Sequence, residues 1–287
     1  MPFPYLIFII KVVIKLKEKN INIKLIIFRL ISALIIIICL IVLFLWQKDN
    51  STNSNLQNDL FVFITEKNLD PENNPSQYNN YIDNSNILND LSNNKNIIND
   101  LEVDFDSLDS INSDTVAWIK INNTNINFPV VQTSNNSYYL TKNFNKQNNS
   151  AGWIFADYRN NFDTLDKNTI VYGHNRRNGT MFSNLTYFLD FNWYENNENK
   201  YFNFITKNQS YIAEIFSIYK LPSRNISLIN KFSSTEEFKQ NIDSWKNASF
   251  YDFKTNVNES DNLLTLCTCD NTSINRIIIV SRLIPIN

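Results

Sequence analysis

Residues 30–46, LISALIIIICLIVLFLW, form a run of seventeen residues without a charge, and this run limits what the first part of the chain can fold into. As a helix, at about 1.5 Å per residue, the run spans roughly 26 Å, close to the thickness of a bilayer's hydrocarbon core. A buried helix of a soluble domain is the alternative, but such helices are rarely apolar on every face. A cleaved signal peptide is disfavoured because the run is long and no A-x-A-like site follows it. We therefore expect a transmembrane signal anchor at 30–46.

The charges on the two sides of this run differ in sign. Residues 1–29 form a basic segment with one acid, Glu18, and six bases, which are Lys11, Lys15, Lys17, Lys19, Lys24 and Arg29. Of the chain's 26 basic and 28 acidic residues, 20 and 27 therefore lie in residues 30–287, a net charge of about −7. The positive-inside bias predicts a cytoplasmic N-terminus, a single crossing of the cell membrane and an extracellular location for residues 47–287. The acidic body argues against a nucleic-acid partner.

Beyond the apolar run the composition changes twice. Residues 47–84 are mostly polar and predict a stalk. Residues 85–287 then predict one extracytoplasmic domain, which begins with NILNDLSNNKNIINDLEVDFDSL. The apolar residues of that stretch recur every three or four positions, a spacing that predicts one or two surface helices.

Short β-like runs separated by polar turns dominate the chain from about Val116. They include VAWIKI, FPVVQ, GWIFADY, NTIVYG, YFNFIT, SYIAEIFSIYKL, NLLTLCTC and RIIIVSRLIPI. This number of short strands predicts a mostly β fold, either a closed barrel or a sandwich. SSTEEFKQNIDSWKNA interrupts the strands and predicts a helix, because it opens with a Ser-x-x-Glu capping box and repeats apolar residues at helical spacing.

The only histidine of the chain, His174, lies in NTIVYGHNRRNGTMFSNL, where a β-like run ends and a polar loop begins. Strand ends and loops often display catalytic groups, although a lone histidine can equally be a hydrogen-bonded structural residue. Two of the chain's three glycines, Gly173 and Gly179, flank this histidine. In a chain this poor in glycine, they indicate backbone positions that a side chain would obstruct. Arg176 and Arg177 are expected to be solvated loop charges.

Cys267 and Cys269 lie at the end of an apolar run, in DNLLTLCTCD, whereas the third cysteine, Cys39, lies inside the apolar anchor. A disulfide between residues two apart on a strand would be strained, because their Cα atoms lie about 7 Å apart. A zinc site lacks a plausible fourth ligand, and no motif implies a metal or organic cofactor. A six-residue hairpin loop after TLCTC would place Arg276 directly opposite Cys269. A thiol, a cation and one histidine are the components of thiolate chemistry.

Together, TLCTC with arginine seven residues on and IVYGHNRRNGTMFSNL resemble the signature segments of the sortases, cysteine transpeptidases of Gram-positive cell surfaces. AWIKINNTNINFPVVQTSNNSYYLTKNF (117–144) and AGWIFADYRNNF (151–162) extend the resemblance, which covers roughly residues 85–287. The 95-residue separation of His174 and Cys269, with a helix inserted before the last hairpin, resembles class B.

This resemblance implies a closed eight-stranded β-barrel with N-terminal helices and a surface groove. It further implies Cys269 as the nucleophile, His174 as the general acid/base and Arg276 as the transition-state-stabilising arginine. A backbone N–H near Asp270 would also hold the oxyanion. The remaining substrate-groove residues that it suggests are Thr268, Cys267, Asn136 and Leu140. Cys267 departs from the serine that is common there in class B, and on an extended strand it would share a face with Cys269. In that position it would either line the groove or trap Cys269 in a reversible disulfide.

Three functions are consistent with these residues. The first is cleavage of a C-terminal Asn-Pro-x-Thr-type sorting signal on secreted proteins, followed by acyl transfer to an amine of a peptidoglycan precursor. The second is pilin polymerisation, in which a lysine amine is the acceptor. The third is a non-catalytic surface module or a thiol hydrolase, and the intact set of cysteine, histidine and arginine argues against the non-catalytic version.

Overall fold

The computed structural model describes residues 23–68, 99–224, 226–272 and 274–286. The chain divides into two compact units, Met1–Lys48 and Asp49–Asn287. Most of the predicted basic segment, and residues 69–98 of the predicted stalk and surface helices, lie outside the described residues.

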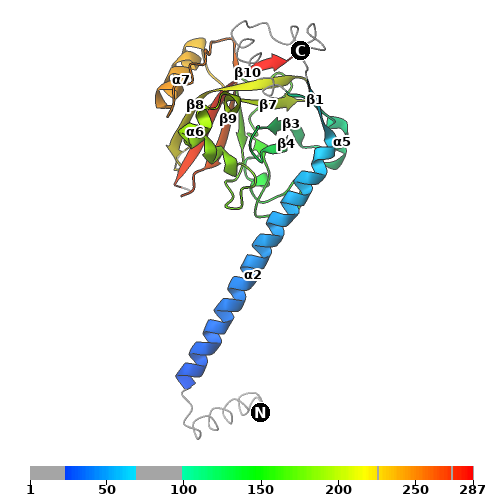
Figure 1. The fold of residues 1–287 in the computed structure, drawn as a ribbon, viewed down its shortest axis with the longest axis vertical. Coiled ribbons are helices and arrows are strands. Elements are labelled where there is room, and N and C mark those ends of the chain that lie inside the picture. Colours follow the sequence, from blue (N-terminus) through cyan, green and yellow to red (C-terminus); the bar gives the residue numbers. More distant parts are fainter. Residues whose placement is uncertain (1–22, 69–98, 225, 273, 287) are drawn as a thin grey trace. The chain divides into compact units, whose positions relative to one another are not determined.

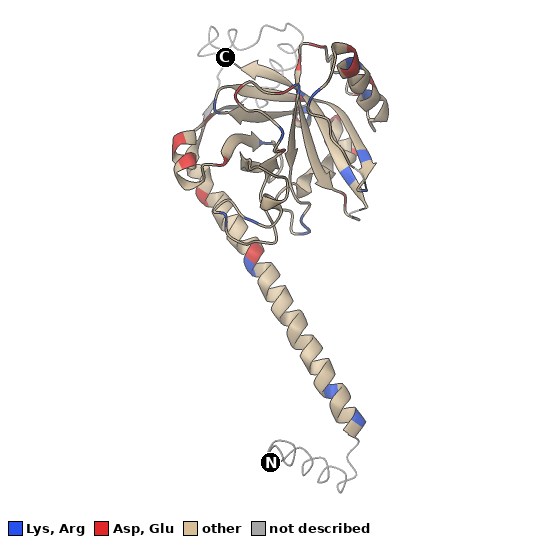
Figure 2. Ribbon diagram, turned by 180° about the vertical axis from the view of Figure 1, so that it is seen from behind, with Lys and Arg blue, Asp and Glu red and all other residues tan. Residues whose placement is uncertain are grey.

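Helix α2 (Ile23–Leu60) contains the whole of the predicted anchor. The side chains of its apolar run are exposed, and by length and composition the helix is able to cross a membrane. Figure 2 shows this run as the uncharged stretch of α2, with charged residues only toward the two ends of the helix.

The predicted polar stalk is wrong over residues 49–60, which belong to the second unit, continue α2 and pack within that unit. Asn50, Asn53, Gln57 and Leu60 are buried there. A short 3-10 turn, η1 (Phe61–Phe63), leads into β1 (Ile64–Asn68). Composition suggested a solvated segment because asparagine and glutamine are usually exposed. Here their amides instead hydrogen-bond barrel loops about 70 to 100 residues away.

The predicted surface helices are replaced in part by a strand. β2 (Asn99–Val103) pairs antiparallel with β1 in a two-stranded sheet. A helix follows immediately, α5 (Phe105–Ile111), and the carboxylate of Asp104 caps it by accepting a hydrogen bond from the Ser107 N–H.

Eight strands close into a barrel, which confirms the predicted fold class (Figure 1). They are β3 (Thr115–Lys120), β4 (Asn127–Val131), β5 (Phe155–Ala156), β6 (Asn168–Tyr172), β7 (Tyr201–Thr206), β8 (Ser210–Pro222), β9 (Asn262–Cys269) and β10 (Asn275–Ile286). Their order around the barrel is β10-β8-β7-β3-β4-β5-β6-β9. The β4–β5 and β6–β9 pairs are parallel, and the other pairs are antiparallel. The parallel β6–β9 pair brings the strand before His174 beside the strand that ends at Cys269.

Side chains on β9 alternate between two apolar clusters. Leu264 and Leu266 belong to the main core, together with Trp118 and Trp153. Cys267 and its neighbours on the opposite face belong to a second cluster, which α7 (Thr235–Ala248) covers. Short helical turns occupy the loops: η2 (Tyr138–Leu140), η3 (Ser183–Leu189), α6 (Phe191–Glu195) and η4 (Asn197–Lys200).

Helix α7 is the predicted insertion before the last hairpin, since it lies between β8 and β9 (Figure 1). Ser234 is its N-cap and accepts from the Glu237 N–H, while the Glu237 carboxylate accepts from Ser233. Phe238 and Ile242 are buried on its inner face. The helix therefore packs on β8 and covers the second cluster, to which Cys267 belongs.

We expect Phe238→Ala to lower the free energy of unfolding by about 3–5 kcal/mol, because a large buried ring would leave a cavity between α7 and the barrel. The matched control is Phe250→Ala, at a phenylalanine that is 53% exposed. Denaturant unfolding followed by tryptophan fluorescence measures both variants. Equal losses for the two would contradict the assignment of α7 to the second cluster.

Candidate active site

The β9–β10 hairpin places Arg276 directly opposite Cys269, as predicted from its loop length. The Arg276 Nη1 donates to the Cys269 Sγ at 2.5 Å. β8 pairs with the other side of β10, so the backbone of Arg276 is held by strands on both sides. The guanidinium is a permanent cation, so this contact places a fixed positive charge and an N–H donor beside the sulfur.

Asp270 closes the same hairpin. Its carboxylate accepts hydrogen bonds from Thr272 and Asn275, which lower its pKa to about 2. Its backbone N–H donates to the Asn275 carbonyl. This N–H is thus already used in the hairpin ladder. The oxyanion role expected of a backbone N–H near Asp270 stays a prediction.

His174 follows β6 and is half-buried. Its Nε2 lies 2.9 Å from the carbonyl oxygen of Leu140. A carbonyl can only accept, so Nε2 carries the proton and Nδ1 is left to gain or lose one. Burial lowers the pKa of His174, and the nearby Arg176 and Arg276 lower it further against the opposing effect of the Leu140 hydrogen bond. The imidazole is therefore neutral near pH 7.

Two glycines allow the backbone to approach this imidazole. Gly152 has φ +62°, and a Cβ on it would lie 2.5 Å from the Tyr139 carbonyl oxygen and 3.0 Å from His174 Cδ2. A Cβ on Gly173 would lie 2.6 Å from the Phe182 ring. No side chain fits at either position without displacing its neighbours. The scarcity of glycine in the sequence predicted that Gly173 lies where a side chain would not fit. The structure shows that the Phe182 ring occupies that space.

A cavity of about 550 Å³ brings most of the predicted site residues together. Its lining consists of Asn136, Leu140, Phe155, Tyr172, Gly173, His174, Ser223, Ile226, Cys267, Thr268, Cys269 and Arg276. Seven of the eight residues predicted from sequence are in this lining, and the eighth, Asp270, lies in the adjoining turn. The cavity therefore joins β6, β9 and β10 to the loops around η2 and after β8.

Cys267 and Thr268 have different positions in the cavity wall. Cys267 is 3% exposed, and burial raises the pKa of its thiol to about 12. Thr268 is also buried, and its hydroxyl donates to the Gly173 carbonyl at 2.7 Å. Both cysteines are free thiols. Cys267 is thus a neutral wall residue at physiological pH, whereas Cys269 is partly exposed to the cavity.

Asn136 is held by a buried network that sequence reasoning missed. Its Nδ2 donates to Asp157 Oδ2, and its Oδ1 accepts from the Tyr158 N–H. Asp157 is fully buried and forms an ion pair with Arg159 at 2.8 Å. Burial alone would raise the pKa of Asp157, but the hydrogen bonds from Arg159, Tyr172 and Asn136 outweigh it and lower that pKa. In the sequence, the acid and base two residues apart in GWIFADYRNNF, Asp157 and Arg159, are the feature that could have predicted this network.

Arg176 is not the solvated loop charge that was expected. Its guanidinium donates to the Ser150 carbonyl and to Asn50 Oδ1. Arg177 is exposed, as predicted. Arg176 and Arg177 differ in exposure because Asn50, in the part of α2 that packs beside this loop, accepts a hydrogen bond from Arg176.

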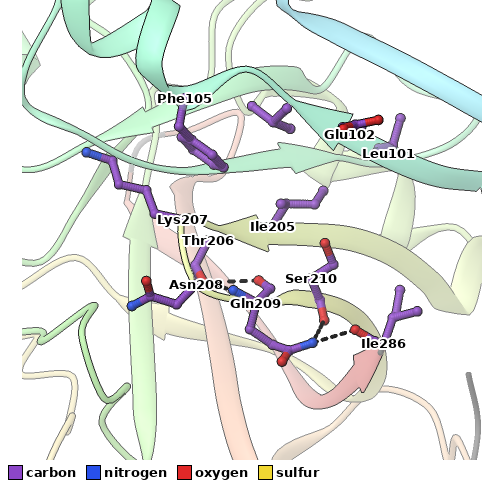
Figure 3. Close-up of a pocket in the computed structure, with 11 residues that line it drawn as sticks. Leu101, Glu102, Phe105, Ile205, Thr206, Lys207, Asn208, Gln209, Ser210 and Ile286 are labelled. Carbon is purple, nitrogen blue, oxygen red and sulfur yellow. Dashed lines mark hydrogen bonds between the residues drawn. The ribbon is translucent and has the colours of Figure 1, made fainter.

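Figure 3 shows another cavity, of about 440 Å³, near the end of β10. Gln209 donates there to the Ile286 and Ser210 carbonyls. None of the residues predicted for catalysis lines it. In the described residues, no cluster of three or more His, Cys, Asp or Glu side chains is arranged to hold a metal ion.

Comparisons with known proteins identify the family and agree with the fold. The sortase-domain family model matches residues 119–284. Sortase B of Listeria monocytogenes is 35% identical over 147 residues, which are 51% of this chain and 59% of that protein. Sortase B of Staphylococcus aureus is 34% identical over 57% of this chain and 68% of its own length. The crystal structure of Clostridium perfringens sortase B matches with a TM-score of 0.59 and 36% identity, covering 63% of this chain and 99% of the other.

The single histidine makes its titration directly measurable by NMR. We expect a His174 pKa below 6.5, because burial and two arginines disfavour the imidazolium. Arg176→Gln removes one of those cations and should raise that pKa. Arg177→Gln, the matched control, should leave it unchanged. A wild-type pKa at or above 6.5, or equal shifts in both variants, would contradict this description of the site.

Proposed function

The chain belongs to class B of the sortase family, and on this premise we propose that it is a membrane-anchored cysteine transpeptidase. It cleaves a C-terminal Asn-Pro-x-Thr-type sorting signal of secreted proteins after the threonine. The acyl group passes to Cys269 and then to an amine of a peptidoglycan precursor. The observation that carries this proposal is the Arg276–Cys269 contact, in one cavity with a histidine whose Nδ1 is free.

The acylation step follows from these groups. The Cys269 thiol gives its proton to Nδ1 of the neutral His174 as Sγ bonds to the carbonyl carbon after threonine. The Arg276 guanidinium, already within hydrogen-bond distance of Sγ, donates to the oxyanion of the tetrahedral intermediate. His174 then returns the proton to the departing amine as the C–N bond breaks. A thioester on Cys269 and a free amine result.

In the second half-reaction, the acyl group moves from Cys269 to the acceptor amine, and His174 acts first as the base for that amine. The acceptor amine attacks the thioester carbonyl, His174 takes its proton, and the Cys269 thiolate leaves and is reprotonated. A new amide bond forms and the free enzyme is regenerated. Because Nε2 donates to Leu140, one nitrogen serves both half-reactions.

The cavity lining supports an uncharged peptide as the donor substrate. Apart from Arg276 its lining is neutral near pH 7, with polar groups such as Asn136 beside apolar ones such as Ile226. The amide of Asn136 has its orientation set by Asp157 and Tyr158, so it presents fixed hydrogen-bonding groups.

Membrane anchoring by α2 is part of the proposal. The exposed apolar run of that helix would span the bilayer, and the basic residues before it favour a cytoplasmic N-terminus. The catalytic domain would then lie outside, where sorting signals and cell-wall amines are available.

We expect the full chain in detergent to cleave a fluorogenic Asn-Pro-Gln-Thr-Asn peptide and to form an adduct with an added amine. Cys269→Ala should abolish both products, because no other group in the cavity supplies the nucleophile. Cys267→Ala is the matched control and should retain activity, because that thiol is buried and protonated. Liquid chromatography with mass detection measures both products, with triglycine and a lysine side chain compared as acceptors.

Activity lost in Cys267→Ala and kept in Cys269→Ala would overturn the assignment of the nucleophile. Cleavage without any amine adduct would identify a hydrolase instead of a transpeptidase.

Arg276→Ala should lower kcat about 10²–10³-fold, the usual cost of removing one oxyanion donor. Arg282→Ala on the same strand is the control, because Arg282 instead pairs with Glu214 at 2.6 Å. Steady-state kinetics on folded variants measures the difference. A kcat for Arg276→Ala within threefold of that of Arg282→Ala would contradict the role given to Arg276.

A further inference from the structure

The barrel-side end of α2, residues 49–57, contacts the loops that surround His174. We call this segment the α2 tail. We propose that the α2 tail positions the His174 imidazole, with Asn53 as the principal positioning residue and Asn50 and Asp49 in support. The role in catalysis rests on the proposed function, whereas the positioning itself does not.

Asn53 makes the most direct connection. It is fully buried, and its Nδ2 donates to the Gly152 carbonyl at 2.9 Å across 99 residues of sequence. Gly152 is the glycine whose missing side chain lets the backbone lie against His174 Cδ2 and the Leu140 carbonyl. The hydrogen bond therefore fixes the residue that packs on the imidazole ring.

The loop on the N-terminal side of Gly152 is held by a second set of contacts. The Asp49 carboxylate accepts from the Ser150 N–H at 2.9 Å, and its backbone carbonyl accepts from Asn149 Nδ2 at 3.0 Å. Asn50 Oδ1 accepts from Arg176, which also donates to the Ser150 carbonyl. The α2 tail thus contacts both the 149–152 loop and the loop that follows His174.

These contacts converge on the carbonyl that sets the histidine tautomer. Leu140 ends η2. The Trp153 N–H donates to the Tyr139 carbonyl in the same turn, next to Gly152. A shift of Gly152 would therefore move the Leu140 carbonyl relative to Nε2. Without that acceptor, the proton of the neutral ring would no longer be confined to Nε2.

The α2 tail also affects the charges beside the imidazole. The charged groups that face His174 are Arg176 and Arg276, and both disfavour the imidazolium. The α2 tail holds Arg176 through Asn50, and Asp49 lies near enough to act on the charge of Arg176. Helix α2 thus contains both the proposed membrane anchor and, in the α2 tail, the residues that act on the position and the charge of the His174 ring.

If these contacts only fasten α2 to the barrel, loss of any one of them should have the same effect on His174. Gln57 allows that possibility to be tested. Gln57 lies one turn further along the same helix, is 9% exposed, and donates to the Asn125 and Asn127 carbonyls. Its amide fastens α2 to the β3–β4 turn without contacting the residues around His174. Gln57→Ala is therefore the matched control for Asn53→Ala.

The experiment uses the full chain in lipid nanodiscs with ¹⁵N-labelled histidine. The one histidine gives one pair of ring nitrogen signals, whose shifts report the tautomer. We expect wild type and Gln57→Ala to show the Nε2–H form, and Asn53→Ala to show shifts averaged between the two tautomers. With the sorting peptide, Asn53→Ala should lower kcat about ten- to a hundredfold with KM nearly unchanged, since the substrate cavity is intact. Gln57→Ala should retain the wild-type kcat.

Wild-type tautomer shifts and kcat in Asn53→Ala would overturn the proposal, as would equal changes in Asn53→Ala and Gln57→Ala. If the wild type cleaves no sorting peptide, the proposed function fails first. The tautomer measurement still decides whether Asn53 positions the ring.

Discussion

The hydrogen-bond register between β9 and β10 is the constraint on which the site depends. It places Arg276 opposite Cys269, and the guanidinium contacts the sulfur. A shift of one residue would turn the arginine to the other face of the sheet. β8 on one side of β10 and β6 on one side of β9 hold that register within a closed barrel. The parallel β6–β9 pair then brings the strand before His174 beside the strand that ends at Cys269, so two residues 95 positions apart in sequence line one cavity.

The histidine is controlled from the opposite wall of the cavity. Its tautomer depends on the Leu140 carbonyl, and the space it occupies depends on the absence of a side chain at Gly152. The Leu140 carbonyl and Gly152 both lie outside the barrel strands. Loop residues keep a fixed position only when other contacts hold them. The Asp157–Arg159 pair supports Asn136, and the α2 tail supports Gly152. The chain thus uses two separate sets of buried polar contacts to order one cavity.

Local patterns were enough to predict the elements of the barrel, the α7 insertion and the Cys269–Arg276 pairing, because strand alternation, a capping box and hairpin length are short-range properties. The family resemblance was needed to choose a barrel over a sandwich and to bring Asn136 and Leu140 to the cavity. The composition predicts a stalk where the α2 tail packs on the barrel loops, and it does not indicate the hydrogen bond between Arg176 and Asn50. Those features depend on contacts between residues 99 and 126 positions apart, and the sequence does not show whether an asparagine or arginine is solvated or held in such a contact.

The central claim is that Cys269 carries the acyl group of the sorting signal. The most direct test is intact-protein mass spectrometry after brief mixing of the full chain with the sorting peptide, followed by fragmentation of the peptide that contains both cysteines. We expect a thioester adduct on Cys269 that disappears when an amine is added, as an amide product appears. An adduct on Cys267, or an adduct on Cys269 that persists in the presence of amine, would contradict it.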